Sequence, residues 1–298
     1  MLFRSYAGLH DWDSLWFFAY ETTAAEFTTG FFDHGGHPGR MVNNLLAAAL
    51  FRRGDVSPAI REFAMAFPPE TEASLAATRG GAWSIADGSH LGVPASLALA
   101  SRLSLRAGAD AAGLTAAPAA PSGSVIESDT KELRWDSSLA NRGAVTVNTP
   151  RTKALIGFTA SRLFDLGGVV IAPGETRQDW STIGVTLLEG DSFDGAGEAR
   201  GLIIATGENA NTGMVWKDAS RTSVGSRWGS APSLVEVVRA SITLPVAARR
   251  LEAWVLNERG ERGEALAVEE VDGKAQVSIG RNGATLWYEL RINAESPN

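Results

Sequence analysis

The chain has 298 residues, of which 44% are hydrophobic and 20% are charged, as in a globular protein of one large or two ordinary domains. Its net charge of −7 and the lack of any run of five Lys or Arg residues disfavour a nucleic-acid partner. Cysteine is absent, which excludes disulfides, thiolate metal sites and a cysteine nucleophile.

The N-terminus and the apolar runs bear on localisation. No apolar region of the signal-peptide type follows residues 1–4. The apolar run at residues 45–51 is too short to cross a bilayer. We therefore expect no membrane partner and take the cytoplasm as the default, although a secreted parent that has lost its signal peptide would leave the same sequence.

Residues 1–57 predict a strand, a loop and a helix. Residues 2–10 have the pattern of the last turns of a preceding helix. Residues 15–20 are nearly all apolar, which predicts a strand buried on both faces, as in a parallel sheet covered by helices. Apolar residues at helical spacing then predict a helix that begins at Pro38 and ends before Gly54. One such unit cannot form a parallel sheet by itself.

The remaining sequence divides into a connecting region and a β-rich domain. Residues 58–122 contain a predicted short strand at residues 62–67 and an Ala- and Pro-rich linker at residues 111–121. Residues 123–298 alternate short β-prone runs with turn signals, which is typical of an antiparallel sandwich or barrel. The predicted strands are residues 125–126, 133–135, 144–148, 154–158, 168–172, 182–188, 201–206, 234–238, 241–244, 250–256, 275–279 and 285–292. The expected fold is mainly β, with an antiparallel β-sandwich preceded by a small α/β segment.

Two carboxylates near the predicted strand are the candidate catalytic residues. Glu21 lies just beyond the strand and Asp33 lies in the following loop. In α/β folds the chemistry is placed at the carboxyl ends of strands. Paired carboxylates about 5–9 Å apart perform glycoside hydrolysis. In the alternative interpretation, Glu21 is a solvated loop residue and Asp33 caps the next turn.

Aromatic and imidazole side chains in the same region are the candidate substrate-binding residues. Trp16 and Tyr20 offer flat faces to sugar rings, and His34 and His37 follow in the Gly-rich loop. Trp135 is either a further exposed sugar platform or a core residue. Asp33, His34 and His37 also have the form of a metal triad, in which the two histidines are feasible ligands, but no third ligand of matching quality is evident nearby, so no metal is predicted.

Two further patterns leave alternatives open. Gly190-Asp-Ser192 resembles the nucleophile block of one class of serine esterase, but it also has the form of a hairpin turn, and the order of the partner residues is wrong for that class. The sequence His34-Gly35-Gly36 resembles an esterase oxyanion loop, but the chain has no Gly-x-Ser-x-Gly elbow. The loop of residues 211–229, which bears Trp216, is either functional or packed against another domain.

Several stretches resemble a known family. Residues 12–20, 32–38 and 47–55 look like the end of the catalytic domain in bacterial (β/α)8-barrel glycoside hydrolases of the cellulase-like and β-galactosidase-like retaining type. Residues 128–136, 148–158 and 211–216 are similar to segments of the β-sandwich that follows this domain. The resemblance implies that residues 1–57 are the eighth strand and helix of such a barrel.

The same resemblance limits the assignment of catalytic residues. It places the acid/base Glu and the nucleophile Glu of the family before Met1, so neither can be assigned to a position in this chain. It does imply substrate-side roles for Trp16 or Tyr20 and for the loop from Asp33 to His37. If the chain cleaves a bond by itself, Glu21 and Asp33 are the expected carboxylates.

The sequence thus leads to three functional hypotheses. The first is a hydrolase of a β-linked polysaccharide or glycoside, or the C-terminal fragment of one, with no cofactor. The second is a non-catalytic carbohydrate-binding β-sandwich module, and the third is a serine esterase that uses Ser192. A homo-oligomer is also expected, because an apolar strand at residues 15–20 would otherwise expose apolar surface and an unpaired edge.

Overall fold

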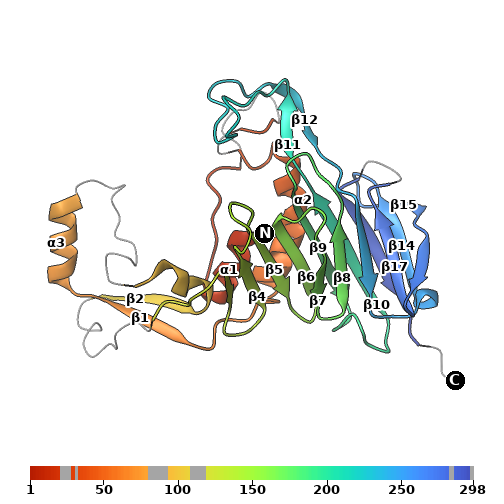
Figure 1. Cartoon of the computed structure of the whole chain (residues 1–298), viewed down its shortest axis with the longest axis horizontal. Helices are drawn as coiled ribbons and strands as arrows, with labels where there is room; N and C mark the ends of the chain where they lie inside the picture. The colour runs from red at the N-terminus through yellow and green to blue at the C-terminus, as the bar shows by residue number, and fades with distance from the viewer. Residues whose placement is uncertain (21–27, 31–32, 80–92, 108–118, 282–284, 296–298) are drawn as a thin grey trace.

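The computed structural model describes residues 1–20, 28–30, 33–79, 93–107, 119–281 and 285–295. The chain is mainly β and contains two large antiparallel sheets (Figure 1). The helices are α1 (Leu2–Leu9), α2 (Pro38–Ala47), the π-helical turn η1 (Ala48–Arg52), α3 (Pro69–Arg79) and the 3-10 turns η3 (Ala95–Leu99) and η5 (Ala248–Arg250). Within the described ranges, no helix is long and apolar enough to span a membrane.

The larger sheet has nine antiparallel strands and forms the centre of the molecule. Its order is β15 (Arg262–Ala265), β14 (Leu251–Leu256), β18 (Trp287–Ile292), β10 (Ala199–Thr206), β9 (Trp180–Glu189), β6 (Thr152–Phe158), β5 (Ala144–Asn148), β4 (Leu133–Asp136) and β3 (Val125–Glu127). Strands β9 and β10 are buried along almost their whole length. A strand with this burial needs a covering layer on each face of the sheet.

The five-stranded sheet supplies one of these layers. Its order is β16 (Val268–Val271), β17 (Lys274–Ile279), β13 (Ala240–Leu244), β8 (Val169–Pro173) and β7 (Phe164–Leu166). Burial alternates along β8, β13 and β17, so one face of this sheet is packed and the other is solvated. Ile183, Ile203 and Tyr288 of the larger sheet share one apolar core with Ile242 and Val277 of the smaller one.

Helix α2 and the turn η1 supply the layer on the other face of the nine-stranded sheet. Leu46 of α2 is fully buried against Gly184 of β9. A Cβ atom added at Gly184 would lie 2.5 Å from the Leu46 Cδ1 atom, so the helix can approach this closely only because position 184 is glycine. Figure 1 shows α2 lying alongside β9.

Helix α1 packs beside η1 on the strands nearer the edge of the larger sheet. Leu9 of α1 and Leu50 of η1 share a second apolar cluster with Leu133, Val147 and Ala154 of β4, β5 and β6. The two helices therefore lie next to each other on one sheet face. This arrangement orders the N-terminal segment through its contacts with the β domain.

A small parallel pair lies within residues 58–122. Strand β1 (Glu62–Phe67) pairs with β2 (Arg102–Ala107) in parallel. The predicted strand at residues 62–67 is confirmed, and helix α3 follows it. Most of the predicted Ala- and Pro-rich linker at residues 111–121 lies outside the described residues.

The predicted strand at residues 15–20 is wrong. These residues form neither a strand nor a helix, and no strand of the described chain pairs with them. Trp16 is 91% exposed and Phe18 is 78% exposed. A strand requires a neighbouring strand with which its backbone groups pair, so apolar composition alone does not make one.

Residues Arg53 and Asp55 fasten the end of η1 to the larger sheet. The Arg53 guanidinium donates to both Asp55 oxygens, with Nε–Oδ1 at 2.7 Å, and to the Leu187 carbonyl of β9 at 2.5 Å. It also donates to Thr186 Oγ1 at 3.0 Å, and Thr152 Oγ1 donates to Asp55 Oδ2 at 2.5 Å. The Asp55 side chain is only 3% exposed, so its charge depends on these partners.

We expect Arg53→Met to lower the free energy of unfolding by about 3 kcal/mol, because it leaves the buried Asp55 carboxylate without its cation. Arg52 is exposed and serves as the control, since Arg52→Met should change the free energy by less than about 0.5 kcal/mol. Urea denaturation of the three proteins measures the difference. Equal losses in the two variants would show that the network does not hold the helix.

Candidate functional site

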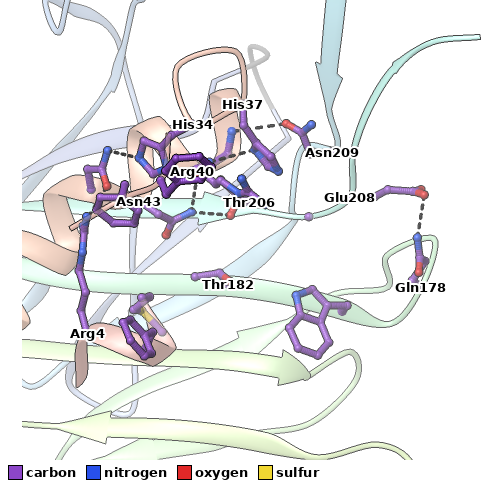
Figure 2. A pocket seen from close by; sticks show the side chains of 18 of the residues that line it. Arg4, His34, His37, Arg40, Asn43, Gln178, Thr182, Thr206, Glu208 and Asn209 are labelled. Carbon is purple, nitrogen blue, oxygen red and sulfur yellow. Dashed lines mark hydrogen bonds between the residues drawn. The ribbon is translucent and has the colours of Figure 1, made fainter. Parts of the chain in front are cut away.

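A pocket of about 580 Å³ opens between the N-terminal half of α2 and one end of the nine-stranded sheet (Figure 2). Its walls come from α1, the segment after α1, the loop before α2, α2 itself, and the ends of β9 and β10. The lining residues are Met1, Phe3, Arg4, Phe17, Phe18, His34, His37, Gly39, Arg40, Asn43, Asn44, Gln178, Trp180, Thr182, Thr206, Gly207, Glu208, Asn209 and Trp216.

The start of α2 forms one wall of the pocket. His37 is the N-cap of this helix, and its Nδ1 atom accepts from the backbone N–H of Arg40 at 3.1 Å. Pro38 follows at the first helical position, where its missing N–H costs nothing. One turn later, the Asn43 amide donates to Thr206 Oγ1 of β10 at 2.9 Å and ties this wall to the sheet.

A chain of side-chain hydrogen bonds crosses from α1 to the loop before α2. Arg4 Nη1 donates to Asn44 Oδ1 at 2.8 Å, which leaves the Asn44 amide group to donate to His34 Nε2, also at 2.8 Å. His34 therefore carries its proton on Nδ1 when neutral. The Phe17 ring lies 4.4 Å from the His34 ring, and the Arg4 guanidinium lies 4.4 Å from the Phe17 centroid.

The strand ends form the opposite wall. Gln178 Nε2 donates to Glu208 Oε1 at 2.7 Å, and Thr182 of β9 lies between this pair and Arg4 (Figure 2). The Trp180 ring is 38% exposed and is held edge-on by Phe158, with ring centroids 5.2 Å apart and planes at 90°. The contact with Phe158 thereby fixes the orientation of the Trp180 indole ring.

The Gly-rich loop is positioned by close backbone contacts. A Cβ atom at Gly36 would lie 2.0 Å from the Thr28 carbonyl oxygen, so only glycine fits there. The buried Asn211 side chain of β11 (Asn209–Thr212) accepts from the Thr29 N–H and donates to the Thr29 carbonyl, both at 2.8 Å. The glycines that resemble an oxyanion loop therefore serve close packing in this structure.

Burial and nearby cations keep both pocket histidines neutral at pH 7. Burial, followed by the charge of Arg40, lowers the pKa of His37 from 6.5 to about 4. Burial also lowers the pKa of His34, and the charges of Arg40 and Arg4 lower it further. Of the described residues that line the pocket, Glu208 has the only carboxylate side chain.

The sequence-predicted residues are only partly brought together. His34 and His37 line the pocket, whereas Trp16 is 91% exposed and bonds to Ser14 Oγ outside it. Tyr20 is 58% exposed, and its carbonyl accepts from the backbone N–H of His34 and Gly35. These Tyr20 bonds hold the loop, while its ring is not part of the pocket lining.

The remaining candidates lie elsewhere or outside the described chain. Trp135 lies in β4 with its ring edge-to-face with Tyr6, at a centroid distance of 6.4 Å. The Asp33 carbonyl accepts from Arg40 Nη1 at 3.3 Å, and Asp33 is not a lining residue. Glu21 lies outside the described residues. The predicted pairing of Glu21 with Asp33 therefore stays a prediction.

The esterase and metal interpretations receive no support from the geometry. Ser192 lies between β9 and β10, as the hairpin interpretation predicts, and no hydrogen bond joins its hydroxyl to a histidine of the described chain. No group of three His, Asp or Glu side chains able to hold a metal ion occurs among the residues that the structure describes.

Sequence reasoning missed the wall that the sheet contributes. Trp180 and Thr206 are in strands, and Gln178 and Glu208 are in the adjoining loops, all more than 130 residues after α2, and no motif in the sequence links them to it. One signal was present: the long loop after β11, interpreted as functional or packed, places Trp216 in the pocket.

Comparisons with known proteins add no further assignment. No protein-family model matches the chain, and neither a curated protein nor a solved structure matches it.

We expect the His37 imidazole to titrate with a midpoint near pH 4 in the folded protein. The unfolded chain binds this proton near the usual pKa of 6.5, so the stability that His37 provides is lost as the pH falls from about 6.5 towards 4. NMR titration of the imidazole protons measures the midpoint. His37→Asn keeps an N-cap residue but removes the titration, and its stability should depend less on pH in this window. A midpoint near 6.5 would contradict the burial of His37.

Proposed function

We propose that this chain is carbohydrate-active and holds a saccharide in the pocket between α2 and the nine-stranded sheet. The observation that carries the proposal is the composition of the pocket lining. The exposed part of the Trp180 ring offers an apolar face, and Asn43, Gln178 and Glu208 offer amide and carboxylate groups beside it. Saccharides present apolar faces and hydroxyl groups together, and such a mixed surface matches both.

The dimensions of the pocket agree with this ligand class. Its volume of about 580 Å³ is within the range of roughly 300–1,000 Å³ that is usual for small-molecule sites. The polar groups are also held in place before a ligand arrives. Gln178 and Glu208 bond to each other, and Asn43 is bonded to Thr206. Preorganised groups lose little conformational entropy when a ligand binds.

The proposal places the chain among the glycoside hydrolases that residues 12–20, 32–38 and 47–55 resemble. In this interpretation, residues 1–57 are the last unit of a (β/α)8 barrel, and the two large sheets form the β-sandwich that follows it. The packing of α1 and α2 on the larger sheet supports a continuous unit of this kind. The absence of a strand at residues 15–20 weighs against the barrel part of the interpretation.

Binding is better supported than cleavage by the described part of the chain. Glycoside hydrolysis requires two carboxyl groups that flank the scissile bond. The described lining residues provide one, Glu208. The non-catalytic binding module is therefore the second candidate function, and the presence or absence of hydrolysis distinguishes the two.

We expect Trp180→Ala to weaken binding of β-linked oligosaccharides by about tenfold, because the variant removes the oriented aromatic face. Isothermal titration calorimetry with cellotetraose, xylotetraose and β-galacto-oligosaccharides measures the affinity. Trp16→Ala is the matched control, since Trp16 lies outside the pocket. A loss in Trp16→Ala but not in Trp180→Ala would move the sugar site to the segment before Tyr20.

Reducing-sugar release by the same protein separates hydrolysis from binding. Activity that is lost in Glu21→Gln or Asp33→Asn supports the sequence-predicted carboxylates, and activity lost only in Glu208→Gln assigns the chemistry to the pocket. Binding without release of reducing sugar identifies a binding module. Absence of both binding and release for every β-linked probe would refute the proposed function.

The homo-oligomer stays a prediction, and its basis is now the exposed aromatic segment. Trp12, Trp16, Phe17, Phe18 and Tyr20 are 47%, 91%, 52%, 78% and 58% exposed. Large apolar side chains that are exposed together in one segment are commonly covered by a partner. We expect analytical ultracentrifugation to show a dimer or larger species, and Trp16→Ser to shift it towards the monomer. A monomer at every concentration measured would refute the prediction.

A further inference from the structure

We infer that the saccharide held in this pocket is anionic, and that Arg4 and Arg40 bind its acidic group. The inference rests on the proposed function and specifies the ligand class of the same site. It starts from the two guanidinium groups that line the pocket. Both are cations for which the described protein supplies no anion.

Arg4 is only partly satisfied by its neighbours. Its Nη1 atom donates to the neutral Asn44 amide, and its guanidinium lies over the Phe17 ring. Burial lowers its pKa, so the charge is partly removed from water. No carboxylate in the described ranges lies within ion-pairing distance of it. A guanidinium has five N–H donors, and most of those on Arg4 remain available.

Arg40, on the helix side of the pocket, also lacks a carboxylate partner in the described chain. Its Nη1 atom donates to a backbone carbonyl, that of Asp33, at 3.3 Å, which leaves the positive charge uncompensated. Across the described part of the chain, no carboxylate forms an ion pair with it either. Arg40 is exposed, so an incoming ligand can reach it.

Some arginines of this protein have a carboxylate partner, and others do not. Arg53, Arg162, Arg200 and Arg262 each have a carboxylate within 2.5–2.9 Å, whereas the buried Arg250 donates only to backbone carbonyls. Arg4 and Arg40 combine the lack of a carboxylate partner with a place in the pocket lining. A positive charge held without an internal partner beside a cavity is suited to an external anion.

The charges are also distributed unevenly along the pocket. Figure 2 shows Arg4 at one end and the Glu208–Gln178 pair at the other. The charges of Arg40 and Arg4 reach His34, where both lower the imidazole pKa. An acidic group is attracted to the arginine end, whereas a neutral hydroxyl can donate to Glu208 at the far end.

The acidic group that the two arginines would bind is a carboxylate or a sulfate on a sugar ring. Both groups present oxygen atoms that match the planar N–H fork of a guanidinium. A neutral saccharide of the same size lacks this interaction and leaves the two cations unpaired. The acidic ligand should therefore bind more tightly, and the difference should shrink as salt screens the charges.

The test compares a matched set of β-1,4-linked trisaccharides by isothermal titration calorimetry at low ionic strength. The probes are cellotriose, its trimeric glucuronic acid counterpart and sulfated cellotriose. We expect at least one acidic probe to bind ten times more tightly than cellotriose, with a smaller difference in added sodium chloride. Tighter binding of the glucuronate trimer identifies a uronate ligand, and tighter binding of the sulfated probe alone identifies a sulfate ester.

Variants of Arg4 and Arg40 test whether these two residues cause the preference for an acidic saccharide. Arg40→Gln should reduce the ratio of the affinity for the acidic probe to that for cellotriose about tenfold, and Arg40→Lys should retain part of the preference. Arg4→Gln should act in the same direction, with its thermal unfolding midpoint checked because Arg4 is partly buried. Arg259→Gln is the control, since Arg259 is exposed and remote from the pocket lining.

The outcomes separate this inference from the proposed function. Equal affinity for cellotriose and both acidic probes overturns the inference and leaves the proposed function standing. A preference that survives both Arg4→Gln and Arg40→Gln also overturns it. If no saccharide binds, the proposed function fails and the inference fails with it.

Discussion

The structure depends on the close contact between α2–η1 and the nine-stranded sheet. Gly184 lets Leu46 approach the strand backbone, and Arg53, which is paired with Asp55, donates to the Leu187 carbonyl of β9 and holds the end of η1 to the sheet. The first contact is apolar and leaves no room for a side chain at position 184, and the second is a buried, hydrogen-bonded ion pair. Together they fix both the distance and the position of the helix along the sheet, because close packing resists expansion and a fork of hydrogen bonds resists sliding.

The pocket is a consequence of this contact. Its lining combines the first turns of α2 with the ends of β9 and β10, so neither half is a site alone. The hydrogen bond from Asn43 to Thr206 closes the junction between them. On the other side, Arg4 reaches the Asn44 amide from α1, whose own position comes from the cluster that contains Leu9 and Leu133. The site is thus built where three separately packed elements converge.

The sequence predicted those features that depend on local preferences. The helix that begins at Pro38 and the β-rich region after residue 123 are both present. The strand at residues 15–20 was mispredicted, because an apolar run does not show whether a partner strand exists. Half of the site was not predictable for a related reason: no local pattern reveals that Glu208 lies opposite α2.

The histidines of the site are better suited to holding it together than to transferring protons. His34 Nε2 already accepts from Asn44, and His37 Nδ1 accepts from the backbone of Arg40. A general base needs a free lone pair directed at the substrate and a pKa near the working pH. These nitrogens are engaged, and burial lowers both pKa values. The proposed recognition of a charged sugar needs only neutral imidazoles and the two cations that lack carboxylate partners in the described chain, whereas cleavage would require carboxylates beyond those that the described lining provides.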